Sequence, residues 1–377
     1  MLPNYLAISG KTRQNDLDVG FTISINPGAS TTRAGIQGGF NGTYGNQENR
    51  QAFLTFGDAS WGSMKLGKDL GIYASDAILN DMTLLGVGMG AGTLAGNTTT
   101  LGRIGTGFMY ADWKSQVAYS SPNFNGLQFT AGVTQAWNAL AGLDTSAGSS
   151  ARGGKSPAFE GKASYDFAAD AVKGKVWVSG ISQKVEGLSN AVAAAGTITG
   201  VDEGELQGTY TEGTTNSING SRTATAWDIG ANVNAAGFGL TGYYGEGRGI
   251  GQTVQLLDGF DSDGEKRKSE QWYTQATYTL PGVGTKLGVS YGQSKLKGND
   301  GETQPDYFNN IKDSMWVAGV YHPITKHLNL VAEYSESKRE VSNYSGWTAP
   351  LSTSSGDQDI SGSGKAKTIS LGAILFF

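Results

Sequence analysis

The chain of 377 residues contains no cysteine, only 8 prolines and only 2 histidines. Without thiols it forms neither a disulfide framework nor a thiolate metal site, and their absence suits a chain that crosses an oxidising compartment unfolded. The scarcity of proline argues against a collagen-like or polyproline-rich chain. Both histidines, His322 and His327, flank one expected turn, so no Ser/His/Asp hydrolase set presents itself. These absences disfavour an enzyme.

Long hydrophobic runs are also missing, although 38% of the residues are hydrophobic. A membrane-spanning helix needs roughly 18–20 consecutive apolar residues, and the least charged stretch, 82–101, is interrupted by glycines and a threonine run. The net charge of −5 leaves no basic footprint for nucleic acid. We therefore exclude a helical membrane protein and expect no nucleic-acid partner.

The chain has instead an excess of glycine and a recurring alternation of apolar and polar residues. Glycine accounts for 58 residues, about twice its usual ~7% share. Successive side chains of a strand point to opposite faces, so residues 365–377 predict a strand with one apolar face and one that is mostly small and polar. The same alternation recurs in 17–26, 127–134 and 227–234. Soluble sandwiches alternate too, so this pattern alone does not decide between fold classes.

About 15 such segments follow one another, in pairs joined by short turns and separated by long polar loops. They cover residues 6–11, 17–25, 52–56, 64–68, 116–120, 127–133, 159–167, 176–181, 227–233, 238–244, 272–280, 287–291, 317–321, 328–334 and the C-terminal segment. Their polar face carries charges in mid-strand, Trp and Tyr cluster at strand ends, and loop lengths alternate short and long, as in outer-membrane barrels.

We therefore predict an all-β fold, a transmembrane antiparallel β-barrel formed by one domain, residues 1–377. Bacterial single-chain barrels have even strand numbers, so about 16 strands are expected, with the first either missing from this chain or misread. Residues 1–4 carry neither the charged nor the apolar region of a signal peptide. For an exported barrel this indicates a mature or re-engineered start rather than a cytosolic address.

Several motifs resemble the Gram-negative trimeric general porins. Residues 49–68 (NRQAFLTFGDASWGSMKLGK) resemble the family's fourth and fifth strands, and 121–126 (SPNFNG) resemble the turn after its constriction loop. Residues 332–335 and Phe377 match its last strands, and 8–12 look like its second strand. The enteric "PEFGG" constriction motif is absent. The resemblance implies a homotrimer in the bacterial outer membrane, surrounded by outer-membrane lipid and lipopolysaccharide, that passes small polar solutes and ions without a cofactor.

The interval 69–112 is far longer than its neighbours and rich in Gly, Ala, Leu and Met. Insertions of this size in a compact fold are usually functional or disordered. The resemblance implies that it is the third loop, folded into the lumen as a constriction. Its apolar run 77–85 supports this, because such residues need a wall to pack on. The alternative is an exposed or subunit-contacting loop.

Charged residues at the strand positions expected to face the lumen are candidates for lining the narrowest part of the pore, the eyelet. The basic set on the early strands is Lys11, Arg13, Arg50, Lys65 and Lys114, of which Lys65 and Arg50 match the family's basic positions best. On the loop we expect Asp76 and Asp81 as the acidic residues, with Arg103 nearby. Opposite charges across a constriction orient dipoles, whereas a ring of one sign favours counter-ions. Other charges that point inward are Asp18, Glu160, Lys162, Asp166, Asp228 and Glu333. Because the lumen is mixed, anion versus cation preference stays open.

Two further motifs carry no function here. Residues 62–68 fit GxxxxGK, but Asp69 replaces the Ser/Thr that would bind Mg²⁺, and no helix follows. Residues 259–270 partly resemble a calcium loop through Asp261, Asp263 and Glu270, yet the first position is glycine and no helices flank it. We interpret this stretch as an acidic surface loop, with a bound cation as the alternative.

The sequence thus predicts a passive diffusion channel. The alternatives are a substrate-specific outer-membrane channel and a surface adhesin barrel whose long loops, such as 185–221 and 340–364, contact a partner.

Overall fold

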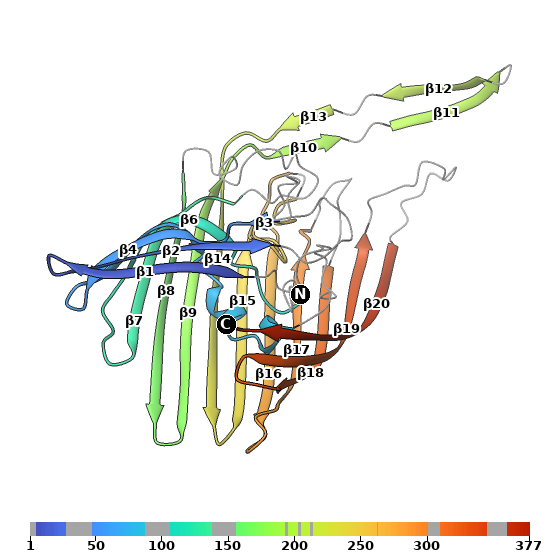
Figure 1. Cartoon of the computed structure of the whole chain (residues 1–377). Coiled ribbons are helices and arrows are strands. Elements are labelled where there is room, and N and C mark those ends of the chain that lie inside the picture. The colour runs from blue at the N-terminus through green and yellow to red at the C-terminus, as the bar shows by residue number, and fades with distance from the viewer. Residues whose placement is uncertain are drawn as a thin grey trace.

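The computed structural model describes residues 5–27, 47–86, 106–137, 156–192, 195–202, 205–211, 214–261, 263–300, 310–344 and 360–377. Within them, one path of antiparallel strands forms a curved sheet (Figure 1). Its strands, in spatial order, are β1 (Leu6–Gln14), β2 (Leu17–Pro27), β4 (Ala52–Asp58), β5 (Gly62–Leu70), β6 (Trp113–Ser120), β7 (Leu127–Thr134), β8 (Ala158–Ala169), β9 (Val172–Val185), β14 (Arg222–Ala235), β15 (Phe238–Arg248), β16 (Lys268–Thr279), β17 (Lys286–Lys297), β18 (Asn310–Pro323), β19 (Leu328–Tyr344) and β20 (Ile360–Leu375). The predicted all-β barrel fold is confirmed, and every predicted segment corresponds to one of these strands.

Short turns join the strands at one end of the sheet. Asn15 and Asp16, with φ of 47° and 63°, connect β1 to β2, and Ala236 and Gly237, with φ of 50° and 86°, connect β14 to β15. Two successive positive φ angles give a turn whose twist matches that of paired strands. Asn, Asp and Gly adopt this left-handed conformation with little strain. The turns therefore set the register in which Arg13 faces Asp18 across the first hairpin.

The sheet has an apolar outer face. Ile23 on β2, Phe129 on β7 and Ile229 on β14 point outward and are 50%, 47% and 51% exposed. Apolar area left in water costs roughly 25 cal/mol per Å², whereas a hydrocarbon surrounding removes that cost. The outer face therefore has the composition of a surface that contacts lipid.

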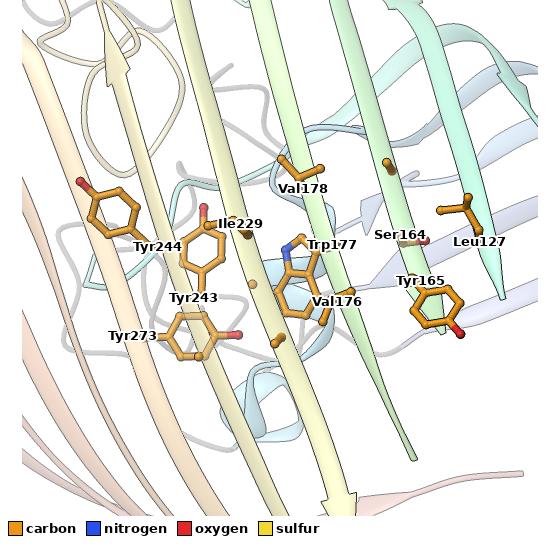
Figure 2. Close-up of a pocket in the computed structure, with 14 residues that line it drawn as sticks. Leu127, Ser164, Tyr165, Val176, Trp177, Val178, Ile229, Tyr243, Tyr244 and Tyr273 are labelled. Carbon is orange, nitrogen blue, oxygen red and sulfur yellow. The ribbon is translucent and has the colours of Figure 1, made fainter. Parts of the chain in front are cut away.

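A shallow groove of about 630 Å³ crosses β8, β9, β14 and β15 on this outer face (Figure 2). Small residues such as Ala163, Ala231 and Gly242 line it, with Tyr165 and Tyr244 among the larger ones. Its lining is almost wholly apolar. Lipid chains suit such a surface better than water does.

The long connections carry the remaining elements. Between β9 and β14, β10 (Ser189–Val192) pairs with β13 (Thr214–Ser217), and β11 (Ala195–Asp202) pairs with β12 (Glu205–Thr211). These ribbons extend beyond the end of the sheet (Figure 1), where the sequence predicted only a polar loop. The two-residue β3 (Gln47–Glu48) pairs with β2. Between β5 and β6 lie α1 (Ser75–Leu79) and the 3₁₀ helix η1 (Met82–Leu85). In the described part of the chain, no helix is long and apolar enough to cross a membrane.

Candidate pore constriction

The connection from β5 to β6 turns onto the inner face of the sheet at residues 72–74. Glu160 Oε2 on β8 accepts hydrogen bonds from the backbone N–H groups of Ile72 and Tyr73, at 2.7 and 2.8 Å. Ser179 Oγ on β9 accepts a third from Ala74 N–H at 3.1 Å. Buried backbone N–H groups need a hydrogen-bond partner. The wall supplies these partners, so the entry of the loop is fixed to β8 and β9.

Asp76 on α1 lies between two lysines of the wall. Its Oδ2 is 2.8 Å from Lys162 Nζ on β8, and its Oδ1 is 3.1 Å from Lys175 Nζ on β9. Burial alone would raise the pKa of Asp76, but the two ammonium groups outweigh burial and hold that pKa below its ordinary value. The carboxylate is therefore neutralised by the wall on which the helix lies.

An aromatic platform, formed by Trp177 on β9, Tyr243 on β15 and Tyr273 on β16, supports α1. Together with Ala77 and Phe108 these side chains form one buried cluster, and Figure 2 shows the three rings beside one another. The Tyr243 and Tyr273 rings stack with centroids 5.5 Å apart. The Tyr273 hydroxyl donates to the carbonyl of Ala77 at 2.8 Å. The platform thus holds α1 by packing and by a hydrogen bond.

Gln275 on β16 holds the chain between α1 and η1. Its Nε2 donates to the carbonyl of Asn80 at 2.7 Å, and its Oε1 accepts from the N–H of Met82 at 2.9 Å. Met82 then packs against Met315 and Val317 of β18. A side-chain amide that both donates and accepts here fixes the orientation of the segment as well as its position.

The segment reaches β19 at Gly86. A Cβ added there would lie 2.4 Å from Oε2 of Glu333, so any larger residue would have to displace the Glu333 carboxylate. Just before η1, the Asp81 carboxylate accepts from the N–H and hydroxyl of Thr83 at 3.0 and 2.9 Å and so caps the helix. Residues 72–86 therefore follow the inner face from β8 to β19.

A family model described as Gram-negative porin matches residues 7–342 of the chain. The chain belongs to the Gram-negative porin family. It is therefore an outer-membrane β-barrel that forms a channel for diffusion of small hydrophilic solutes, and its family consists of channels rather than enzymes. A comparison with curated proteins finds no sequence that matches.

Solved structures share the porin fold at low sequence identity. The outer membrane channel DcaP of Acinetobacter baumannii has a TM-score of 0.62 and 13% identity, over 100% of this chain and 85% of that one. The anion-selective porin from Comamonas acidovorans gives 0.56 and 14%, over 99% and 90%. The trimer form of in-vitro folded OmpT from Vibrio cholerae gives 0.52 and 13%, over 100% and 92%. Trimers are thus found among proteins of this fold.

Two of the predicted basic residues, Lys11 and Arg13, lie on the inner face of the porin's β1. They line a cavity of about 830 Å³ against β2, β4 and the turn before β7. Arg13 forms ion pairs with Asp18 at 3.0 Å and Asp58 at 2.8 Å. Lys11 is exposed, and among the described residues it has no ion-pair partner. Lys11 therefore contributes to this cavity a positive charge that no ion pair among the described residues holds.

The remaining predicted residues of the early strands have mixed surroundings. Lys65 on β5 forms an ion pair with Asp69 of the same strand, and its Nζ is 4.8 Å from the Phe53 ring centroid. The Arg50 guanidinium lies 5.7 Å from the centroid of the Trp113 ring. Arg103 of the loop lies outside the described residues. Of this group, Lys65 is half-buried on the inner face, so its ammonium group can contact a solute in a narrow channel.

Lys114 has a different environment from the other predicted basic residues. It is 2% exposed, and its Nζ lies 2.5 Å from Glu160 Oε1 and 2.6 Å from Gln255 Oε1. The Thr134 hydroxyl donates to the same Glu160 oxygen at 2.7 Å. Lys114 is thus an internal anchor beside the loop entry and does not line open space. Asp76, held by Lys162 and Lys175, is likewise turned to the wall.

The residues that hold the loop were largely missed by sequence reasoning. They are Lys175, Trp177, Ser179, Tyr273 and Gln275. The alternation of β9, where Val176 and Val178 point outward, places Lys175, Trp177 and Ser179 on the inner face. This alternation can be read from the sequence, but it does not predict which residue of the strand a given loop residue contacts.

In the stretch that partly resembles a calcium loop, the Asp261 carboxylate is already hydrogen-bonded within the protein, and Glu270 belongs to a strand. Asp261 Oδ1 accepts from the N–H groups of Asp263 and Glu265 at 3.0 and 2.8 Å, and its Oδ2 accepts from Asn299 Nδ2 at 2.7 Å. Glu270 is a residue of β16. Among the described residues, no group of three or more His, Asp or Glu side chains is placed to hold a metal ion.

Proposed function

We propose that this porin works as a homotrimer of passive channels, in which solutes pass between residues 72–86 and the early strands of the barrel. The observation that carries this proposal is the path of the loop, which is held on the inner face from β8 to β19 and leaves the inner face of β1–β5 facing it. No reaction is needed. Polar wall groups replace part of a solute's hydration, and the narrowest point limits its size.

The proposed selectivity residues are Lys11, Arg13 and Lys65. Their acidic neighbours on the same face are Asp18, Asp58 and Asp69. Because these three cations are balanced by three carboxylates, we propose a weak ion selectivity set by Lys11, which has no ion-pair partner among the described residues. On the loop side Asp76 contributes little field, since Lys162 and Lys175 neutralise it.

Residues on the outer face support a position for the boundary between lipid headgroups and lipid tails. On β20, Lys365 and Lys367 precede Ile369 and Leu371, which are 75% and 77% exposed. On the neighbouring strands charged residues likewise give way to an aromatic level: the ring centroids of Trp272 and Tyr291 are 5.5 Å apart, and those of Trp316 and Tyr334 are 4.9 Å apart. Such aromatic girdles mark the interface between lipid tails and headgroups.

Beyond this girdle a charged belt supports contact with anionic headgroups. Its lysines outnumber its glutamates: the belt consists of Lys268, Lys295, Lys312, Lys338, Lys365 and Lys367 with Glu246, Glu270, Glu336 and Glu340. Ion pairs such as Lys312–Glu340 at 2.6 Å order the belt. We propose that its surplus lysines contact phosphates of outer-membrane lipid and lipopolysaccharide, as basic clusters do at anionic membrane surfaces.

Planar-bilayer recording of the purified protein tests the proposal. A homotrimer of open channels gives ohmic conductance that appears in units of three, and chemical cross-linking gives a trimer band. A protein that inserts but never conducts would overturn it.

Liposome swelling with small neutral sugars separates the alternatives. A passive porin admits them at rates that fall with solute size. A substrate-specific channel instead shows saturable current block by one class of solute, and an adhesin barrel admits none.

A further inference from the structure

The first half of the connection between β15 and β16 is buried, whereas Asp263 and Glu265 in its second half are exposed. Ile250, Val254 and Leu256 are each 0% exposed. A loop that lies over the outside of a barrel mouth does not bury consecutive turns in this way. Residues 249–261, named here the inner segment, therefore fold into the protein.

The inner segment is hydrogen-bonded to the returning part of the constriction loop. Tyr110 N–H donates to the carbonyl of Thr253 at 2.9 Å, and Tyr110 and Val254 form a parallel β-bridge. Gln255 Nε2 lies 3.3 Å from the carbonyl of Tyr110 and 3.4 Å from that of Ala111. The two segments are thus joined through their backbones.

Wall residues hold the inner segment at two further points. Lys114 on β6 donates to Gln255 Oε1 at 2.6 Å while pairing with Glu160. On β17, the Ser294 carbonyl accepts from Gln252 Nε2 at 3.1 Å, and its hydroxyl accepts from Gly107 N–H at 3.0 Å. The buried Lys114 therefore links the entry of the constriction loop to the inner segment.

Apolar contacts fix the inner segment against the strands on this side. Val254, Leu256 and Phe260 form a buried cluster, and its other buried members are Trp137, Val185, Leu188 and Ala224. Val185 lies on β9 and Ala224 on β14, near the end of these strands that leads into long loops. The segment is held by packing as well as by hydrogen bonds.

Two groups of polar side chains on the inner face differ in exposure. A covered wall consists of Ser179, Gln271, Gln275, Ser290, Ser294 and Asp313, all buried although they are polar and face inward. An open wall consists of Lys11, Thr55, Lys65, Gln128 and Thr130, all exposed or half-buried. The cavity of about 830 Å³ lies against the open wall.

We infer that the inner segment is a second constriction element that, with residues 72–86 and 106–112, closes the β8–β18 side of the lumen and confines solutes to the open wall. The inference rests on the proposed passive channel. It makes Thr55, Gln128 and Thr130 pore-lining residues, and it makes Ser294 a residue that permeating solutes do not reach.

Single introduced cysteines test this directly, because the chain has none of its own. Thr55→Cys and Thr130→Cys represent the open wall, and Ser294→Cys represents the covered wall. Each variant is recorded in planar bilayers before and after a charged, membrane-impermeant methanethiosulfonate. We expect modification to change the conductance of both open-wall variants and to leave Ser294→Cys unchanged. Rapid modification of Ser294→Cys, or no effect at both open-wall positions, would overturn the inference.

A second variant removes the cover itself. Replacing Gln252–Leu257 by three glycines in the Ser294→Cys background should raise the conductance about twofold, because more of the cross-section fills with water, and should make the cysteine reactive. Unchanged conductance and an unreactive cysteine in a folded trimer would contradict the inference. If the unmodified protein does not conduct, the proposed function fails instead, so the two failures are distinct.

Discussion

The open wall and the covered wall of this barrel share the same alternation of apolar and polar residues, but their inward polar side chains differ in exposure. The open wall keeps Lys65, Gln128 and Thr130 partly exposed, whereas the covered wall buries Gln275, Ser290 and Ser294 under chain that folds back onto it. On the covered wall, Ser179, Gln275 and Ser294 are hydrogen-bonding partners for loop backbone, since a buried backbone group without a partner costs free energy. Polar residues thus contact water on the open wall and stabilise the folded loops on the covered wall.

The largest effect should come from breaking the anchor shared by both inward segments. Glu160→Gln leaves the buried Lys114 without its counter-ion and weakens the bonds to Ile72 and Tyr73. Removing one partner of a buried ion pair costs about 3–5 kcal/mol. Urea unfolding in lipid vesicles measures the loss.

Glu246→Gln is the matched control, because Glu246 pairs with Lys268 at 3.2 Å on the outer face, where both side chains are partly exposed. Its cost should stay within about 1 kcal/mol. Equal losses in the two variants would show that the buried anchor has no special role.

Next in size is a change beneath the aromatic platform. A Cβ at Gly230 would lie 2.1 Å from Cζ2 of Trp177, so Gly230→Ala must displace the ring that supports α1. We expect a loss of about 1–3 kcal/mol, as for other overpacked sites, together with noisier single-channel currents.

Gly242→Ala on the neighbouring strand is the control. An added Cβ there meets nothing within 4 Å, and both substitutions change the unfolded chain alike. A thermal midpoint that falls equally in both variants would mean that strand glycines matter here for reasons other than contact with Trp177.

The sequence predicted the strands well because a period of two is a local property. Ile23 and Phe129 were placed outward by alternation alone, and their exposure confirms it. The role of the loop between β5 and β6 came from family resemblance. Its contacts were not predictable, because Asp76 meets Lys162 and Lys175 about a hundred residues later in the chain. Alternation predicts which face of the sheet a strand residue points to. Which strand residue a loop residue contacts along the barrel axis depends on how the loop packs.

The inner segment was hidden for a related reason. Residues 249–261 show neither a helical nor a strand period, and their glycines and glutamines read as an ordinary loop. Their burial depends on Lys114, Tyr110 and Ser294, which lie on three other parts of the chain. Only the folded arrangement brings these partners together.

Acid should loosen the covered wall and leave the open wall in place. The folded-state pKa of Asp76 lies below its ordinary value, so its ion pairs stabilise the loop fully above that ordinary value of about 3.9. That stabilisation is lost as the pH falls through the lower, folded-state value. We expect more frequent closures or current noise near pH 3 than at pH 7.

Asp76→Asn cannot form these ion pairs at any pH. Its recordings at pH 7 should already resemble those of the unsubstituted protein in acid, and they should change little on acidification. A variant with the full acid response would place the titrating group elsewhere.

The smallest effect should come from the charge of the open wall. Lys11→Gln removes a cation that has no ion-pair partner among the described residues, so we expect the permeability ratio in a salt gradient to move toward cations by about a factor of two. Lys365→Gln removes the same charge from the outer face of β20, where aqueous salt screens it from the channel within about 10 Å. Reversal potentials measured in a gradient centred on ~0.1 M salt, where this screening length applies, compare the two variants. An equal shift in both would mean that the net charge of the protein sets selectivity. A shift confined to Lys11→Gln would place the selective part of the path against the open wall, because a charge acts on a permeating ion only where little water or salt separates them.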